Sequence, residues 1–289
     1  MEWFVFALSA AFLVSITSVI EKKVLFREHA TEFSATIAVM NFLITIPFFY
    51  LVDFTISPEI IFFIFVAGVF ASVGFLFIAK AMRHMEISAV SPLMNLGPGF
   101  TAIFAVLILS EMLSPLNIIG IVTLISGSYI LEIDFKSHNI TTPIKKIWKS
   151  RYIHYVFLAM GSYSISAITC KYVLEFTDPV TLIFVEQFFI VLVFLAILQL
   201  FYDGIGGIKH GIKKIGKWVI IMPVLIVSYR LLQSVAIQMT YVSLVIPIKR
   251  LSTLFSTVMG GGIFREHGLY KKIIACAIMI VGACLVIIG

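Results

Sequence analysis

The chain has 289 residues, of which 61% are hydrophobic and 12% are charged, with a formal net charge of +6 at pH 7. This composition excludes an ordinary soluble domain, and the apolar runs repeatedly reach the roughly 20 residues that cross a bilayer. The composition therefore predicts an all-α membrane protein with many spans.

Taken in chain order, the apolar runs predict ten membrane-spanning helices. Their expected ranges are 3–20, 33–52, 60–82, 87–110, 115–131, 153–174, 179–202, 218–240, 242–264 and 270–288. The first run has no basic residues ahead of it and no small-residue cleavage site behind it, so we interpret it as a span and not as a signal peptide.

Charges in the loops are distributed unevenly. The lysines and arginines of the loops follow odd-numbered spans, whereas the other connections carry acidic residues: Glu2, Asp53, Glu59, Glu111, Glu175 and Asp178. Cytoplasmic loops are enriched in lysine and arginine, so the odd-numbered loops are predicted in the cytoplasm of the cell, with both termini outside. The net positive charge then indicates contact with anionic membrane lipids and no nucleic-acid partner.

The chain contains an internal repeat, because residues 88–131 recur 155 residues later as residues 243–286. We infer a first five-helix repeat over 1–132, a basic cytoplasmic linker over 133–152 and a second five-helix repeat over 153–289. Five is an odd number, so the second repeat enters the membrane from the opposite side. Inverted repeats of this kind place a substrate site near the midplane, around a central cavity.

One short passage, A-x6-S-x-V-x-P, occurs in each half: as Ala81, Ser88, Val90 and Pro92, and as Ala236, Ser243, Val245 and Pro247. A glutamate then ends the fourth span of each repeat, and an apolar helix with Gly127 or Gly282 follows. These features resemble the EamA domain of the drug/metabolite transporter superfamily over nearly the whole chain. The resemblance implies a ten-helix carrier with alternating access, in a family that moves amino acids, sugars, nucleotide sugars, phosphorylated sugars and drugs.

Prolines interrupt two of the predicted spans. Pro92 and Pro247 each lie about five residues into a span, where proline removes a backbone hydrogen bond and kinks the helix. Freed carbonyls at that depth need protein or a water-filled cavity, so we interpret the kinks as lining the cavity; kinks that only serve packing are the alternative. Pro98 loosens the fourth span again, whereas the ninth has Thr253 at that place and is expected to keep its helix.

The strongest indication of substrate is the pair Lys249 and Arg250, which stands where the first repeat has Met94 and Asn95. The pair begins about 10 Å into the ninth span, where a cation is unfavourable unless it faces a cavity or a counter-charge. The pair predicts an anionic substrate, and snorkelling to the membrane surface is the alternative. It also resembles the phosphate-binding pair of the plastid sugar-phosphate translocators, and that resemblance makes Lys171 the counterpart of a further lysine in the sixth span.

Other polar residues within spans complete the predicted substrate site: Glu186, Gln187, Tyr229, Arg230, Gln233 and Asn95. Adjacent helical positions point about 100° apart, so Lys249 and Arg250 cannot both face straight into the cavity. Glu186 is expected either to form a structural ion pair with Arg230 or Arg250, or to couple its protonation to transport. Glu111 is expected to be architectural, at the positive end of the helix that starts at Pro115.

No motif for catalysis or metal binding is present: the histidines lack metal-ligand spacing, no nucleophile pairs with a base, and no glycine-rich phosphate loop occurs. We therefore expect no enzyme, cofactor or metal. Gly120, Gly127, Ala275, Gly282 and Ala283 are predicted to let the fifth and tenth helices pack closely, or to form a homodimer contact.

The function predicted from these features is secondary active transport of a small anionic or zwitterionic metabolite, coupled to protons or to a counter-substrate. Two alternatives remain open. One is an exporter or flippase of amphipathic or lipid-linked compounds, and the other is a receptor or assembly subunit that transports nothing.

Overall fold

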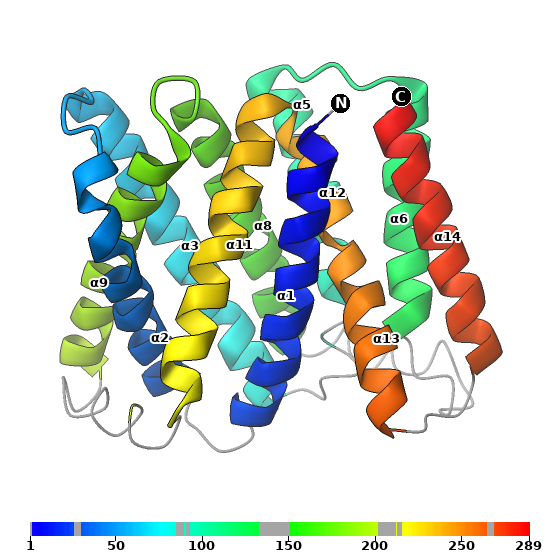
Figure 1. Ribbon diagram of the computed structural model, residues 1–289, viewed down its shortest axis with the longest axis horizontal. Helices are drawn as coiled ribbons and strands as arrows, with labels where there is room; N and C mark the ends of the chain where they lie inside the picture. Colours follow the sequence, from blue (N-terminus) through cyan, green and yellow to red (C-terminus); the bar gives the residue numbers. More distant parts are fainter. Residues whose placement is uncertain are drawn as a thin grey trace.

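A computed structural model describes residues 2–25, 30–84, 90, 93–132, 151–201, 212, 216–264 and 269–289. The ordered elements of this part of the chain are helices, with no strand among them (Figure 1). They are α1 (Trp3–Leu25), α2 (Ala30–Thr45), η1 (Ile46–Leu51), α3 (Pro58–His84), α5 (Gly97–Leu109), α6 (Pro115–Glu132), α8 (Arg151–Val173), α9 (Pro179–Phe201), α11 (Trp218–Met239), α12 (Val242–Lys249), α13 (Leu251–Phe264) and α14 (Leu269–Ile288). The all-α prediction is confirmed for these residues.

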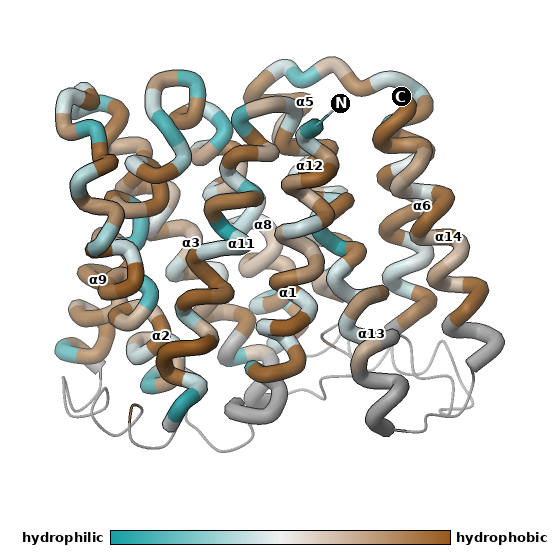
Figure 2. The backbone as a smooth tube through the Cα atoms, viewed as in Figure 1, coloured by the Kyte–Doolittle hydropathy of each residue, from teal (hydrophilic) through white to brown (hydrophobic). Residues whose placement is uncertain are grey.

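Six segments of this part of the chain are long and apolar enough to cross a membrane: α1, α2 together with η1, α3, α8, α9 and α11. Shorter apolar helices lie at Gly97–Leu109, Pro115–Leu131 and Ile273–Ile288. Helices satisfy their backbone polar groups internally, which is why such apolar runs are stable as spans. Figure 2 shows hydrophobic residues along the length of the helices, as expected of surfaces that face lipid.

The helices form one bundle, with both chain termini at the same end (Figure 1). Helix α6 packs along α14, α3 along α8, α1 along α11, and α2 along α9. All four pairs join a helix of the first half of the chain to one of the second half, so the core is built between the halves.

Helices α6 and α14 approach closely through glycines. A Cβ added to Gly120 would lie 2.7 Å from the backbone nitrogen of Val286, and one added to Gly282 would lie 2.7 Å from the backbone nitrogen of Leu124. A Cβ at Gly127 would similarly stand 2.7 Å from Cγ of Met279. The predicted close packing of the fifth and tenth helices is confirmed, and these glycines face a neighbour within the same chain.

The ninth predicted span is broken just after Pro247, where a kink was expected, whereas Thr253 lies within a helix, as expected. Helix α12 ends at Lys249 and α13 begins at Leu251, with a tight turn at Arg250 between them. The Arg250 backbone N–H donates to the carbonyl of Pro247 at 2.9 Å, and the N–H of Thr253 donates to the carbonyl of Arg250 at 3.0 Å. These short-range bonds replace helical ones just after a proline, which cannot donate a backbone hydrogen bond.

The fourth predicted span is interrupted at the equivalent place. A turn at Asn95 and Leu96 precedes α5, and the N–H of Leu96 donates to the carbonyl of Leu93 at 3.0 Å. Pro98 then stands at the start of α5, where its fixed φ suits the first helical turn. The repeat spacing pairs Asn95 with Arg250, so the two breaks fall at matching residues. The predicted kink at Pro92 lies outside the described residues.

Helix α12 occupies the interior of the bundle. Residues Val242 to Ile248 are all buried, and the helix contacts α1, α5, α6, α8, α11, α13 and α14. A helix that is apolar all round is stable only in such surroundings. The buried α12 therefore carries Lys249 and the adjacent Arg250 into the middle of the protein.

Glu111 fixes the first turn of α12 and does not serve the helix that starts at Pro115. Its carboxylate accepts the backbone N–H of Val242 at 2.8 Å and that of Ser243 at 3.2 Å, and it also accepts the Ser243 hydroxyl. Four N–H groups at a helix start lack helical partners, and a carboxylate also suits the positive end of the dipole. The architectural role of Glu111 is confirmed, but its helix is 131 residues further along the chain.

Candidate functional site

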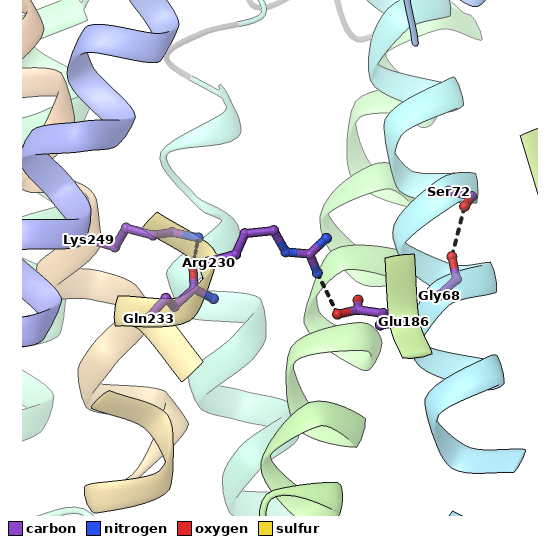
Figure 3. Close-up of polar contacts among 6 residues, drawn as sticks. All are labelled: Gly68, Ser72, Glu186, Arg230, Gln233 and Lys249. Atoms are coloured by element: carbon purple, nitrogen blue, oxygen red, sulfur yellow. Dashed lines mark hydrogen bonds and ion pairs between the residues drawn. The ribbon is translucent and has the colours of Figure 1, made fainter. Parts of the chain in front are cut away.

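Glu186 and Arg230 form an ion pair within the bundle. Nη2 of Arg230 on α11 donates to Oε2 of Glu186 on α9 at 2.7 Å. The Glu186 side chain is 1% exposed and that of Arg230 is 24% exposed. Of the two partners expected for Glu186, the structure selects Arg230 (Figure 3).

Lys249 is held by the same face of α11. Its ammonium donates to Oε1 of Gln233 at 2.7 Å, and Gln233 lies three residues after Arg230, which places both on one side of the helix. Figure 3 shows Arg230 extending toward Glu186 and Lys249 toward Gln233. Through this one face, helix α11 therefore contacts both α9 and the end of α12.

Arg250 points in a different direction from Lys249. A Cβ built on Gly97 would lie 3.2 Å from Nη2 of Arg250 and 3.8 Å from Cγ of Met160, so the guanidinium lies against the start of α5 and near α8. The divergence agrees with the angle expected between adjacent helical positions. Two cations from one break thus contact two different walls of the bundle.

Lys249 is close enough to interact electrostatically with both Arg230 and Arg250. Tyr163 on α8 lies within the same range of Arg230 and Arg250, and of Glu21 on α1. The sequence interpretation missed Tyr163 and Glu21. Glu21 directly follows the first predicted span and adjoins Lys22, and Tyr163 is an unremarkable aromatic residue in an apolar helix.

A hydrogen bond between Thr101 on α5 and Ser164 on α8 was also missed. The two hydroxyl oxygens are 2.9 Å apart and both side chains are buried. The Thr101 hydroxyl also contacts the carbonyl of Gly97 at 3.3 Å. This bond fixes α5 against α8 one turn beyond the Arg250 contact. Small hydroxyl residues are common in apolar helices, so their spacing gave no signal.

Lys171 is not in contact with the Lys249 and Arg250 pair. Its ammonium donates to the backbone carbonyl of Ile237 at 3.0 Å, near the C-terminal end of α11, where a cation is favourable. The amide nitrogen of Asn95 donates to the carbonyl of Ser128 on α6 at 3.1 Å. The structure therefore gives both residues interhelical contacts of their own.

Gln187 directly follows Glu186 in the chain, and Tyr229 directly precedes Arg230. Gln187 is fully buried, and neither its amide oxygen nor its amide nitrogen has a hydrogen-bond partner among the described residues. Tyr229 is partly buried beside Arg230 and interacts electrostatically with Glu186. Unsatisfied buried polar atoms are unusual in folded proteins and mark this part of α9 as a candidate for bound water or ligand.

Gly68 of α3 sets the distance between α3 and the Glu186 turn of α9. A Cβ there would lie 3.3 Å from Cβ of Phe189 and 3.5 Å from the backbone oxygen of Glu186. The carbonyl of Gly68 accepts a hydrogen bond from the Ser72 hydroxyl at 2.8 Å (Figure 3).

Within the described residues, no three histidine, cysteine, aspartate or glutamate side chains are grouped to hold a metal ion.

Comparison with known proteins agrees with this architecture. The model of the EamA-like transporter family matches residues 1–133 and again residues 150–288. A solved structure titled only "Crystal structure of protein" superposes with a TM-score of 0.75 at 14% identity, covering 99% of this chain and 98% of that one. At that identity the likeness concerns the fold alone. A comparison with curated proteins finds no match.

Proposed function

Because the chain belongs to the EamA-like transporter family, and is thus a multi-pass membrane transporter, we propose that it is a secondary active carrier with alternating access. The proposed substrate is a small anionic or zwitterionic metabolite, and the proposed location is the cell membrane. In this proposal ten spans form two inverted five-helix repeats, and the substrate binds between them near the midplane. The matching breaks at Asn95 and Arg250 support that arrangement.

The observation that carries the proposal is the gathering of cations around the α12–α13 break. Lys249 lies within electrostatic range of Arg230 and of Arg250, and Arg230 forms an ion pair with Glu186. Cations within a membrane bundle are expensive unless they face a partner or a water-filled path. The Lys249 ammonium donates to the neutral amide of Gln233, and an anionic group on the substrate would compensate its charge.

The half-helices add a second attraction for anions. Helix α5 begins at Gly97 and α13 begins at Leu251, so two helix starts lie beside the Arg250 guanidinium or directly after it. The start of a helix carries a partial positive charge from its dipole. Broken helices in other transporters present such ends to anionic substrate groups.

Counterflow in proteoliposomes tests the proposal. Vesicles loaded with unlabelled succinate, L-glutamate, glucose 6-phosphate or L-alanine are diluted into the same labelled compound, and choline serves as a cationic control. We expect saturable accumulation of at least one anion or zwitterion and none of choline. Absence of counterflow for the four compounds, together with movement of a fluorescent phospholipid between leaflets, would instead favour the flippase alternative.

A further inference from the structure

The two members of the Glu186–Arg230 ion pair differ in accessibility. Arg230 is 24% exposed, whereas Glu186 is 1% exposed. Oxygen Oε2 of Glu186 accepts the hydrogen bond from Arg230 at 2.7 Å, while Oε1 is buried without a hydrogen-bond partner among the described residues. A solute that enters the site therefore meets the arginine and not the carboxylate.

Arg230 is also a suitable group to exchange one anion for another. A guanidinium binds a carboxylate or phosphate through two parallel hydrogen bonds. Lys249 lies within electrostatic range of Arg230 and of Arg250, and its charge would draw an anion to the same place. An anion bound there competes with Glu186 for Arg230.

Little else near Glu186 can compensate its charge once Arg230 is engaged elsewhere. Arg230 and Tyr229 on α11 and Cys170 on α8 interact with it electrostatically. The neighbouring α2 and η1 contain no lysine, arginine or histidine. The basic residues of α3, Lys80, Arg83 and His84, begin about 18 Å along the helix from Gly68. A buried carboxylate without a partner takes up a proton, because burying an isolated charge is unfavourable.

We propose that this ion pair couples transport to protons: an anionic substrate bound by Arg230 displaces Glu186, and Glu186 then binds one proton. The proton adds to a carboxylate oxygen and no other bond changes; when the anion leaves, Arg230 pairs with Glu186 again and the proton is released. Substrate and proton are bound in the same state of the protein and leave together. The coupling is therefore symport and not exchange. This inference rests on the proposed function, since it requires an anionic substrate.

Calorimetry on the purified, unaltered protein tests the coupling directly. Succinate, L-glutamate and glucose 6-phosphate are titrated in two buffers that differ in ionisation enthalpy, which yields both the affinity and the number of protons taken up. Near neutral pH we expect uptake of about one proton for each anion bound, following proton linkage. Binding without proton uptake, or binding that requires sodium in its place, would overturn the coupling and leave the proposed function standing. Failure of all three anions to bind would contradict both.

A matched pair of variants locates the proton. Glu186→Gln has no carboxylate to accept the proton, so we expect anion binding without proton uptake. The affinity should be higher than that of the unaltered protein, because the anion no longer has to displace a carboxylate from Arg230. Glu32→Gln is the control: Glu32 also has a buried carboxylate oxygen without a partner, but it lies near the start of α2. Proton uptake by Glu186→Gln equal to that of the unaltered protein would refute the assignment. If Glu186→Gln does not fold, Glu186→Asp takes its place, and the calorimetry on the unaltered protein still decides whether anion binding is coupled to proton uptake.

Transport gives a second readout in the same vesicles. A pH gradient, alkaline inside, should stimulate uptake of the counterflow substrate by the unaltered protein and by Glu32→Gln, and should not stimulate uptake by Glu186→Gln. Equal stimulation of all three proteins would show that the proton does not travel on Glu186.

Discussion

Arg250 and Gly97 are in direct contact where the two broken helices meet. The position that a Cβ would take on Gly97 lies 3.2 Å from Nη2 of Arg250. Arg250 occupies the break between α12 and α13, and Gly97 opens α5 two residues after the repeat partner of Arg250. The direction of the guanidinium therefore depends on the absence of a side chain at Gly97.

A side chain at Gly97 should weaken anion binding. Gly97→Leu is expected to displace the Arg250 guanidinium and raise the dissociation constant about tenfold, equivalent to about 1.4 kcal/mol. Gly97→Ala should have a smaller effect, since the end of an arginine can shift by a few tenths of an ångström. Gly161→Ala is the control, because nothing lies within 4 Å of a Cβ built there. Equal affinities of Gly97→Leu and Gly161→Ala, measured by calorimetry, would exclude Arg250 from the site.

Neutralising the cations at the break should also weaken binding. Lys249→Gln or Arg250→Gln is expected to cost about 1.5–3 kcal/mol of affinity, the range for a hydrogen bond to a charged group. Arg250→Lys should retain only part of the affinity that Arg250→Gln loses, because an ammonium cannot form two parallel bonds to an oxyanion. Lys217→Gln, at an exposed position at the start of α11, should leave affinity unchanged. Normal affinity in a folded double variant would favour the hydrophobic-substrate alternative.

Removing the carboxylate of Glu111 should destabilise the protein. Glu111→Ala leaves the Val242 and Ser243 N–H groups of buried α12 without their acceptor, at an expected cost of about 1–3 kcal/mol. The thermal unfolding temperature in detergent measures the loss. Exposed Glu175→Ala provides the comparison, and a similar shift in both variants would mean that the Glu111 cap is unimportant.

Enlarging the glycines between α6 and α14 should separate these helices. Gly120→Val or Gly282→Val places a side chain against the backbone of the neighbouring helix, which cannot yield as a side-chain end can. We expect a loss of about 1–3 kcal/mol in stability, typical of overpacking. Gly99→Ala, whose Cβ would meet only Cδ1 of Ile125 at 3.4 Å, should be nearly neutral in the same unfolding assay.

Labelling of single cysteines tests the proposed orientation. In a background without Cys170, Cys276 and Cys284, a cysteine at Ser137 or Ser150 should react in intact cells only with a membrane-permeant maleimide. A cysteine at Ser57 should react with an impermeant one. The opposite labelling pattern would place the basic loops outside and both termini in the cytoplasm.

Several features of the fold were predictable because they depend on neighbouring residues in the chain. Apolar runs determined where the long helices form, since a helix pairs its own backbone groups and lipid tolerates no other arrangement. The pairing of Glu186 with an arginine was also predictable. A buried carboxylate needs a partner, and few cations lie within the predicted spans.

The sequence by itself thus determined the helical membrane fold, the transporter family and the presence of two adjacent cations, Lys249 and Arg250, within a predicted span. Only the tertiary structure decided that Arg230 is the partner of Glu186, that Lys171 binds the carbonyl of Ile237, and that Glu111 caps α12. Each of these contacts joins residues of different helices. Helix formation depends on the backbone and on local hydrophobicity, whereas such contacts depend on which helices become neighbours after packing, and spacing along the chain does not contain that information.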